Sequence, residues 1–164
     1  FGFSEKKALT KLFLDVNLVK EITSSEAFLM LKKDSDSRLV DVRTEIEIFS
    51  VGFPDLESIG KKVSFIEWNQ SFFSNSSKSF LEKFRKKFGI DVKGNFMFIC
   101  KSGIRSKFAA LTVEESYNSG NDVIRLFNIV DGFEGNTVLQ EIDNKKNGWK
   151  FLGLPWKKPE KVNL

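Results

Sequence analysis

The chain contains one cysteine, Cys100, and no histidine. Two cations, Lys101 and Arg105, and a glycine, Gly103, follow Cys100 closely. Basic neighbours favour the ionised form of a cysteine, and a glycine lets the backbone approach the sulfur. A thiolate is a strong nucleophile, so this pattern predicts covalent catalysis by Cys100. The lack of histidine excludes Cys-His catalysis, Ser-His-Asp catalysis and every histidine-based metal site.

The elements expected around Cys100 strengthen this prediction. Residues 96–99 form an apolar run that predicts a buried strand. After the loop, Ser106 is a suitable first residue for a helix whose apolar side chains recur at helical spacing before a stop at Gly120. Such a loop presents N–H groups and partial positive charge to an anion. We therefore expect the N–H groups of residues 101–106 to surround the sulfur, although a lone cysteine after a strand can also be an inert buried thiol.

The rest of the chain alternates between strands and helices. Strands are predicted at residues 19–22, 38–42, 63–68, 96–99 and 123–130. Helices are predicted at residues 4–16, 24–33, 45–50, 77–88, 106–119 and 137–144. Residues 23–26 have the form of a capping box, which begins a helix. The alternation predicts an α/β fold, with a mostly parallel sheet, helices on both faces and the reactive loop at the carboxyl ends of the strands.

Length and composition indicate one domain. At 164 residues, of which 41% are apolar, the chain is long enough for one core and short for two. We expect an N-terminal extension at residues 1–18, one domain at residues 19–157 and a C-terminal tail at residues 158–164. The helix in the extension is either docked on the domain or a partner surface, and we favour the docked helix.

Charge and hydropathy exclude other classes of protein. The net charge of +4 does not indicate nucleic-acid binding, because the lysines are dispersed among acids. No apolar run approaches the roughly 18 residues of a membrane span. The N-terminus shows no signal peptide. Because the chain begins at Phe1 and not at Met, removal of a preceding segment stays an open alternative. A single cysteine allows no intrachain disulfide and favours a reducing, cytoplasmic location.

Residues 100–106 resemble the active-site loop of rhodanese-type sulfurtransferases, which reads Cys, basic residue, any residue, Gly, any residue, Arg, and Ser or Thr. Three further blocks are similar to that family and occur in its order: residues 39–43, residues 128–133, and residues 148–149 with 153–155. The likeness covers residues 19–157. It departs from the family at residues 52–54, where a histidine-containing segment is usual, so this side of the pocket is not predicted by the resemblance.

The resemblance implies a rhodanese-like fold and a sulfurtransferase. Cys100 would take a sulfane sulfur from a small anionic donor, such as thiosulfate or a persulfide. It would pass that sulfur to cyanide or a thiol, including a protein thiol. Four residues separate Cys100 from Arg105, whereas Cys-based phosphatases place five there, so the smaller loop suits a sulfur atom better than a phosphoryl group. No cofactor or metal is expected.

The resemblance also suggests roles for single residues. Cys100 is the expected nucleophile, and Arg105 either orients the donor or braces the loop through Asp41 or Glu47. The expected donor-binding residues are Lys101, Ser102, Gly103, Ile104 and Ser106. Lys101 would attract the donor, but it lacks the planar fork of the arginine that thiosulfate-using relatives often carry there, which weakens thiosulfate as the native donor.

Two supporting roles complete the predicted site. Ser106 is expected to cap the helix while donating toward the sulfur. Asp41, with Arg43 beside it, is expected to support the fold rather than take part in chemistry. The alternative for these two residues is a surface ion pair that contributes little.

Two other functions stay open. The first is a non-catalytic or regulatory rhodanese-like binding module, and the second, less favoured, is a Cys-dependent phosphatase or arsenate reductase. We favour the active sulfurtransferase because the loop at residues 100–106 is complete. The oligomeric state stays open as well.

Overall fold

The computed structural model describes residues 19–69, 76–117 and 124–160. Three expectations therefore lie outside the described residues: the helix at residues 4–16, the helix stop at Gly120 and the last four residues of the tail. Within the described ranges, no helix is both long enough and apolar enough to cross a membrane.

A parallel sheet of five strands forms the centre of the fold, in the order β1-β6-β5-β2-β4. The strands are β1 (Val19–Ile22), β2 (Ser37–Asp41), β4 (Ser64–Phe65), β5 (Gly94–Ile99) and β6 (Ile124–Ile129). β5 lies in the middle of this order, between β6 and β2, and its last five residues are buried. The loop after β5 therefore leaves the middle of the carboxyl edge of the sheet, where α/β folds bind ligands.

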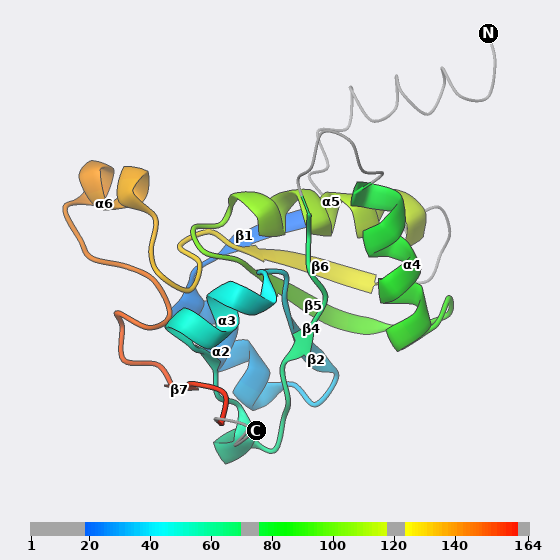
Figure 1. Ribbon diagram of the computed structural model, residues 1–164, viewed down its shortest axis with the longest axis horizontal. Coiled ribbons are helices and arrows are strands. Elements are labelled where there is room, and N and C mark those ends of the chain that lie inside the picture. Colours follow the sequence, from blue (N-terminus) through cyan, green and yellow to red (C-terminus); the bar gives the residue numbers. More distant parts are fainter. Residues whose placement is uncertain (1–18, 70–75, 118–123, 161–164) are drawn as a thin grey trace, which may run out of the picture.

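Helices cover both faces of the sheet (Figure 1). The helices are α2 (Ser24–Lys33), α3 (Glu45–Val51), α4 (Ser76–Phe88), α5 (Ile104–Tyr117) and α6 (Thr137–Asp143), with a 3-10 turn at Glu57–Ile59. Because side chains alternate along a strand, Phe96 and Phe98 of β5 pack in one core cluster with α4 and α5. Met97 and Ile99 pack in a second cluster with α2. The predicted α/β fold, with a sheet covered on both faces, is confirmed.

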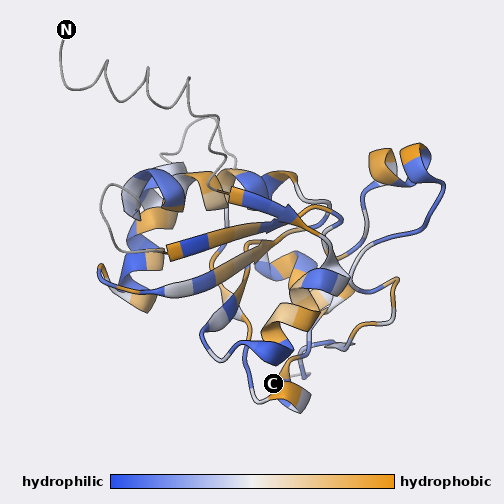
Figure 2. Cartoon of the chain, turned by 180° about the vertical axis from the view of Figure 1, so that it is seen from behind, coloured by the Kyte–Doolittle hydropathy of each residue, from blue (hydrophilic) through white to orange (hydrophobic). Residues whose placement is uncertain are grey.

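The C-terminal part of the domain returns to the end of α3 and the segment that follows it. A short antiparallel pair joins β3 (Phe53–Pro54) to β7 (Trp156–Lys157). Trp149 is fully buried in the α2 cluster, and its Nε1 donates to the carbonyl of Pro155 over 2.8 Å. In contrast, α6 stands apart from the sheet, and both hydrophilic and hydrophobic residues lie along it (Figures 1 and 2).

The element boundaries agree with the sequence except at a few ends. The predicted capping box at residues 23–26 is present, and a second one at Thr44 and Glu47, which was not predicted, begins α3. The strand predicted at residues 63–68 is shorter in the structure: β4 pairs with Val40 and Asp41 of β2, and the N–H groups of Ile66 and Trp68 then bond to the carbonyls of Asp41 and Val42. Regular pairing thus covers only Ser64–Phe65.

Candidate functional site

Cys100 lies directly after β5, and its side chain is buried, with 1% of the residue exposed. Glycines hold the following loop against the turn after β6. Gly103 has φ +93°, and a Cβ there would lie 2.3 Å from the Val130 carbonyl oxygen. Gly132 has φ +63°, and its Cβ would lie 2.3 Å from the Lys101 carbonyl oxygen. Only glycine permits this approach, so the two backbones fix each other's position.

Two polar groups touch the sulfur. The N–H of Gly103 donates to Cys100 Sγ over 3.1 Å, and Ser106 Oγ lies 3.2 Å from Sγ. The expectation that the N–H groups of residues 101–106 surround the sulfur is met in part. Among the hydrogen bonds of the described residues, the sulfur accepts one backbone N–H, that of Gly103.

The helix after the loop begins earlier than predicted. α5 starts at Ile104, so Ser106 is its third residue and not its cap, and the predicted capping role is wrong. The physical reason is Gly103, whose positive φ completes the turn and lets helical geometry begin at the next residue. The early start places Arg105 and Ser106 in the first turn, where one side chain faces α3 and the other faces the sulfur. Ser106 itself is fully buried.

Asn128, which the sequence analysis did not single out, lies at the centre of the site. It is 2% exposed, and the register of the sheet places it between Glu21 of β1 and Phe98 of β5. Its Oδ1 accepts the Ser106 hydroxyl over 2.7 Å. Its Nδ2 donates to the Gly103 carbonyl over 3.0 Å and to Glu21 Oε2 over 2.8 Å. An amide in an otherwise largely apolar strand was the signal that could have revealed it.

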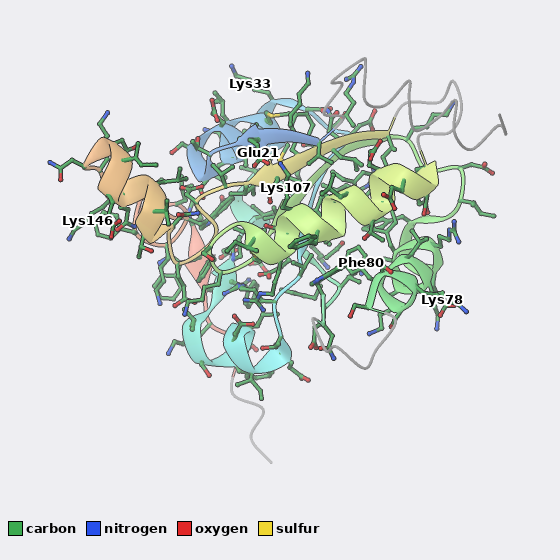
Figure 3. The ribbon with its side chains drawn as sticks, turned by 90° about the horizontal axis from the view of Figure 1, so that it is seen from above. Glu21, Lys33, Lys78, Phe80, Lys107 and Lys146 are labelled. Carbon is green, nitrogen blue, oxygen red and sulfur yellow. The ribbon has the colours of Figure 1, made fainter. Side chains whose placement is uncertain are left out.

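Glu21 in turn pairs with Lys107 of α5, at the rim of the site. Both side chains are partly exposed, and their close approach can be followed in Figure 3. A chain of contacts therefore runs from the surface through Asn128 and Ser106 to the sulfur of Cys100.

The carbonyl groups of the loop are held by the segment after β6. Three consecutive carbonyls, those of residues 100–102, accept from Phe133 N, Glu134 N and Asn136 Nδ2 over 2.8, 3.0 and 2.9 Å. Asn136 Nδ2 also donates to the Val130 carbonyl over 3.2 Å. Asn136 is a second residue that the sequence analysis missed, since nothing in its local sequence shows that its side chain reaches back to the loop.

Arg105 binds Glu47 of α3 through both terminal nitrogens. The distances are 2.8 Å from Nη1 to Oε2 and 2.6 Å from Nη2 to Oε1. Of the two partners considered for Arg105, Asp41 and Glu47, the structure pairs it with Glu47. The hydrogen bonds from Arg105, aided by those from Thr44, lower the pKa of Glu47 from 4.5 to about 2 against the opposing effect of burial. The same pairing raises the pKa of Arg105.

Asp41 and Arg43 form a second arginine pair, which is wholly buried. Arg43 Nε lies 2.9 Å from Asp41 Oδ1, Nη2 lies 2.6 Å from Oδ2, and neither side chain is exposed. Nη2 also donates to the Gly52 carbonyl over 2.9 Å, and the guanidinium lies 4.1 Å from the centre of the Phe133 ring. The alternative of a surface pair is therefore wrong. Support of the fold by Asp41 fits this geometry.

The remaining predicted residues lie on the outer side of the loop. Lys101 is exposed, Ser102 is partly buried, and Ile104 is 61% exposed at the first position of α5. The structure thus brings the whole predicted set, residues 100–106, into one loop and helix turn. Within the described ranges, no group of three or more acidic, cysteine or histidine side chains gathers closely enough to hold a metal ion.

Comparisons with known proteins place the chain in a family. Residues 20–163 match the family model described as STR4 middle domain. An uncharacterized protein of Rickettsia prowazekii is 35% identical over 140 residues, which cover 85% of this chain and 98% of that protein. A crystal structure from M. tuberculosis is 32% identical, with a TM-score of 0.64, over 86% of this chain and 98% of its own.

Two more distant solved structures show the fold. A polysulfide-sulfur transferase homodimer from Wolinella succinogenes is 20% identical, with a TM-score of 0.54, and the match covers 100% of this chain and 98% of that one. A rhodanese-like domain protein from Staphylococcus aureus is 15% identical, with a TM-score of 0.51, over 87% of this chain and 100% of that one. The rhodanese-like fold expected from the sequence is confirmed, and the chain belongs to the STR4 middle domain family.

Proposed function

We propose that this protein is a sulfurtransferase in which Cys100 carries a sulfane sulfur as a persulfide. The observation that carries the proposal is the position of the sulfur. It lies at the middle of the carboxyl edge of the sheet, accepts the Gly103 N–H over 3.1 Å and touches the first turn of α5. An N–H group and a helix N-terminus at this position stabilise the negative charge that passes through the sulfur as it attacks and leaves. The shared fold of the polysulfide-sulfur transferase from Wolinella succinogenes supports the same chemistry.

The reaction proceeds in two displacement steps. In the first, the Cys100 thiolate attacks the outer sulfur of the donor. A sulfur–sulfur bond forms on Cys100 while the donor's own bond to that sulfur breaks, and the donor leaves with the electron pair, as sulfite or as a thiolate. In the second, an acceptor thiolate or cyanide attacks the outer sulfur, and Cys100 leaves as a thiolate. This is nucleophilic covalent catalysis with ping-pong kinetics, and Cys100 returns to its starting state.

The two cations of the loop, Lys101 and Arg105, have different roles. Both terminal nitrogens of Arg105 bind Glu47, so we assign Arg105 the role of bracing the loop. Lys101 is exposed at the outer side of the loop and is the residue that attracts an anionic donor. The hydroxyl of Ser106 and the N–H of Gly103 contact the attacking atom.

A non-catalytic module is the second candidate, and one observation favours it. Cys100 is only 1% exposed, so a donor must reach a sulfur that lies beneath its own loop. A module of this kind would keep the fold and the buried thiol but would not load sulfur.

One experiment separates these two functions. The full chain is incubated with thiosulfate and, separately, with polysulfide, and the intact mass is measured before and after addition of cyanide. A sulfurtransferase gains the mass of one sulfur atom and loses it to cyanide as thiocyanate. Cys100→Ser is the matched control, because it removes the only thiol of the chain. A wild-type chain that gains no sulfur from either donor contradicts the proposal and leaves the non-catalytic module.

A further inference from the structure

The hydrogen bonds of Asn128 fix the direction in which its amide points. Its Nδ2 faces two groups that can only accept, the Gly103 carbonyl at 3.0 Å and the Glu21 carboxylate at 2.8 Å. A flipped amide would place an oxygen against both acceptors, which is repulsive. The Oδ1 atom must therefore face Ser106, where it lies 2.7 Å from the hydroxyl oxygen.

This direction decides where the single hydroxyl proton of Ser106 goes. Since Oδ1 of Asn128 has no proton, the hydroxyl donates to it. The lone pairs of Ser106 Oγ are then left to face Cys100 Sγ at 3.2 Å, and the thiol proton donates to them. In this arrangement Ser106 is an acceptor for a neutral thiol and not a donor to a thiolate.

We propose that Asn128 is a positioning residue that restrains the ionisation of Cys100 by holding the Ser106 hydroxyl away from the sulfur. When the thiol proton leaves to a base in the solvent, the hydroxyl must turn toward the thiolate. Oδ1 of Asn128 then loses its partner inside the protein, and an unpaired buried acceptor is unfavourable. The amide thus favours the thiol form, and removal of the amide releases the hydroxyl to stabilise the thiolate.

The charged groups around the sulfur are largely neutralised in pairs. The direction of the Ser106 hydroxyl can therefore have a measurable effect on the ionisation of Cys100. Arg105 of α5 pairs with Glu47 of α3, Arg43 pairs with Asp41 at the end of β2, and Lys107 of α5 pairs with Glu21 of β1. Lys101 in the loop is exposed to solvent. None of these charges is changed by a substitution at Asn128, although Glu21 loses one hydrogen bond.

The inference rests on Cys100 being the reactive group of the proposed function, but it can be tested without any sulfur donor. The thiolate absorbs in the far ultraviolet, and the chain has a single cysteine, so a pH titration of absorbance reports Cys100 alone after subtraction of Cys100→Ser. Failure of sulfur loading and failure of this inference are therefore separate results.

The decisive variant is Asn128→Ala in the full chain. We expect the midpoint of the thiolate titration to move about one pH unit lower, which is about tenfold more thiolate at a pH below the midpoint. Asn136→Ala is the matched control, because Asn136 also holds a loop carbonyl through its amide but does not touch Ser106. We expect its titration midpoint to match that of the wild type. An equal shift in both variants would show a general loosening of the loop and would overturn the inference.

Ser106→Ala supplies a second test, which holds even where Asn128→Ala fails to fold. The proposed arrangement predicts a small change of midpoint in Ser106→Ala, and no further change when Asn128→Ala is added to it. A thiolate fraction about tenfold lower in Ser106→Ala would mean that the hydroxyl already donates to the sulfur, and would overturn the inference. A fall in thermal midpoint for Asn128→Ala without any change in its titration would likewise reduce Asn128 to a structural residue.

Discussion

Two arginines near the carboxyl edge of the sheet each bind a carboxylate through two nitrogens, Nε and Nη2 in Arg43 and Nη1 and Nη2 in Arg105, yet their surroundings differ. Arg43 binds Asp41 two residues away, and neither side chain is exposed. Arg105 binds Glu47 from a different helix, with side chains 21% and 24% exposed. Removal of one partner costs much free energy in a buried pair, whereas it costs little in a partly exposed pair. The same interaction can thus hold a fold in one place and only orient a loop in the other.

The contacts around each pair support the same distinction between holding the fold and orienting the loop. The buried pair also binds the Gly52 carbonyl and lies over the Phe133 ring, so it joins segments from three parts of the chain. The partly exposed pair uses a carboxylate that already caps α3, where Glu47 Oε2 accepts from Thr44 N and Oγ over 3.0 Å. One carboxylate therefore links the N-terminus of α3 to the first turn of α5, next to the reactive sulfur.

Breaking the buried pair should have the largest effect. Arg43→Met leaves the Asp41 carboxylate buried and unpaired, and we expect the free energy of unfolding to fall by about 3–5 kcal/mol. The double variant Asp41→Leu with Arg43→Met should cost less, since it leaves no uncompensated charge. Urea unfolding measures both. Equal losses in the single and double variants would show that packing, and not the unpaired charge, dominates at this position.

Breaking the partly exposed pair should affect chemistry more than stability. Glu47→Gln keeps one oxygen for Thr44 and Arg105 Nη1, but it removes the charge and places an amide NH2 against Arg105 Nη2, so we expect a loss of about 1 kcal/mol or less in the free energy of unfolding. We expect the rate of sulfur loading on Cys100 to fall by about tenfold, because a displaced loop positions the sulfur poorly. Glu45→Gln, an exposed carboxylate on the same helix, is the control. A large stability loss with an unchanged loading rate would place Glu47 in the same class as Asp41.

The pH dependence of stability should show the smallest of the three effects, and it tests the pairing of Glu47 directly. The pKa of Glu47 is lowered from 4.5 to about 2, so its pairing stabilises the folded state above about pH 4.5. That contribution is lost as the pH falls through about 2. The free energy of unfolding of the wild type should therefore decline toward that of Glu47→Gln between these values. A difference in the free energy of unfolding between the wild type and Glu47→Gln that stays constant across this pH range would contradict the assigned pairing.

Much of the fold could be predicted from the sequence, because the signals are local. Three local signals each show their element within a short window: the apolar run before Cys100, the capping box at residues 23–26, and the helical spacing of Phe80, Phe84 and Phe88 in α4. The alternation of these elements then leaves a covered parallel sheet as the expected architecture. The boundary of α5 was less predictable, since it depends on the φ of Gly103, which the sequence permits but does not require.

The site was predictable only where its residues are consecutive. Residues 100–106 carry their own pattern, and Glu47 was one of two candidates for Arg105. Asn128 and Asn136 reach the loop across 25 and 34 positions of sequence, through hydrogen bonds to Gly103 and Ser102. Their contribution depends on strand register and on a turn that only the folded chain brings together. Whether the assembled residues transfer sulfur stays a prediction.

The mutual packing of Gly103 and Gly132 has a consequence for anyone who redesigns this domain. Each glycine touches the backbone of the other's segment, so the two turns cannot be lengthened or exchanged independently. A peptide tag inserted between Asp131 and Asn136 would displace the loop that holds the sulfur of Cys100. The far end of α6, which stands clear of the sheet, offers a safer place for such a graft (Figure 1).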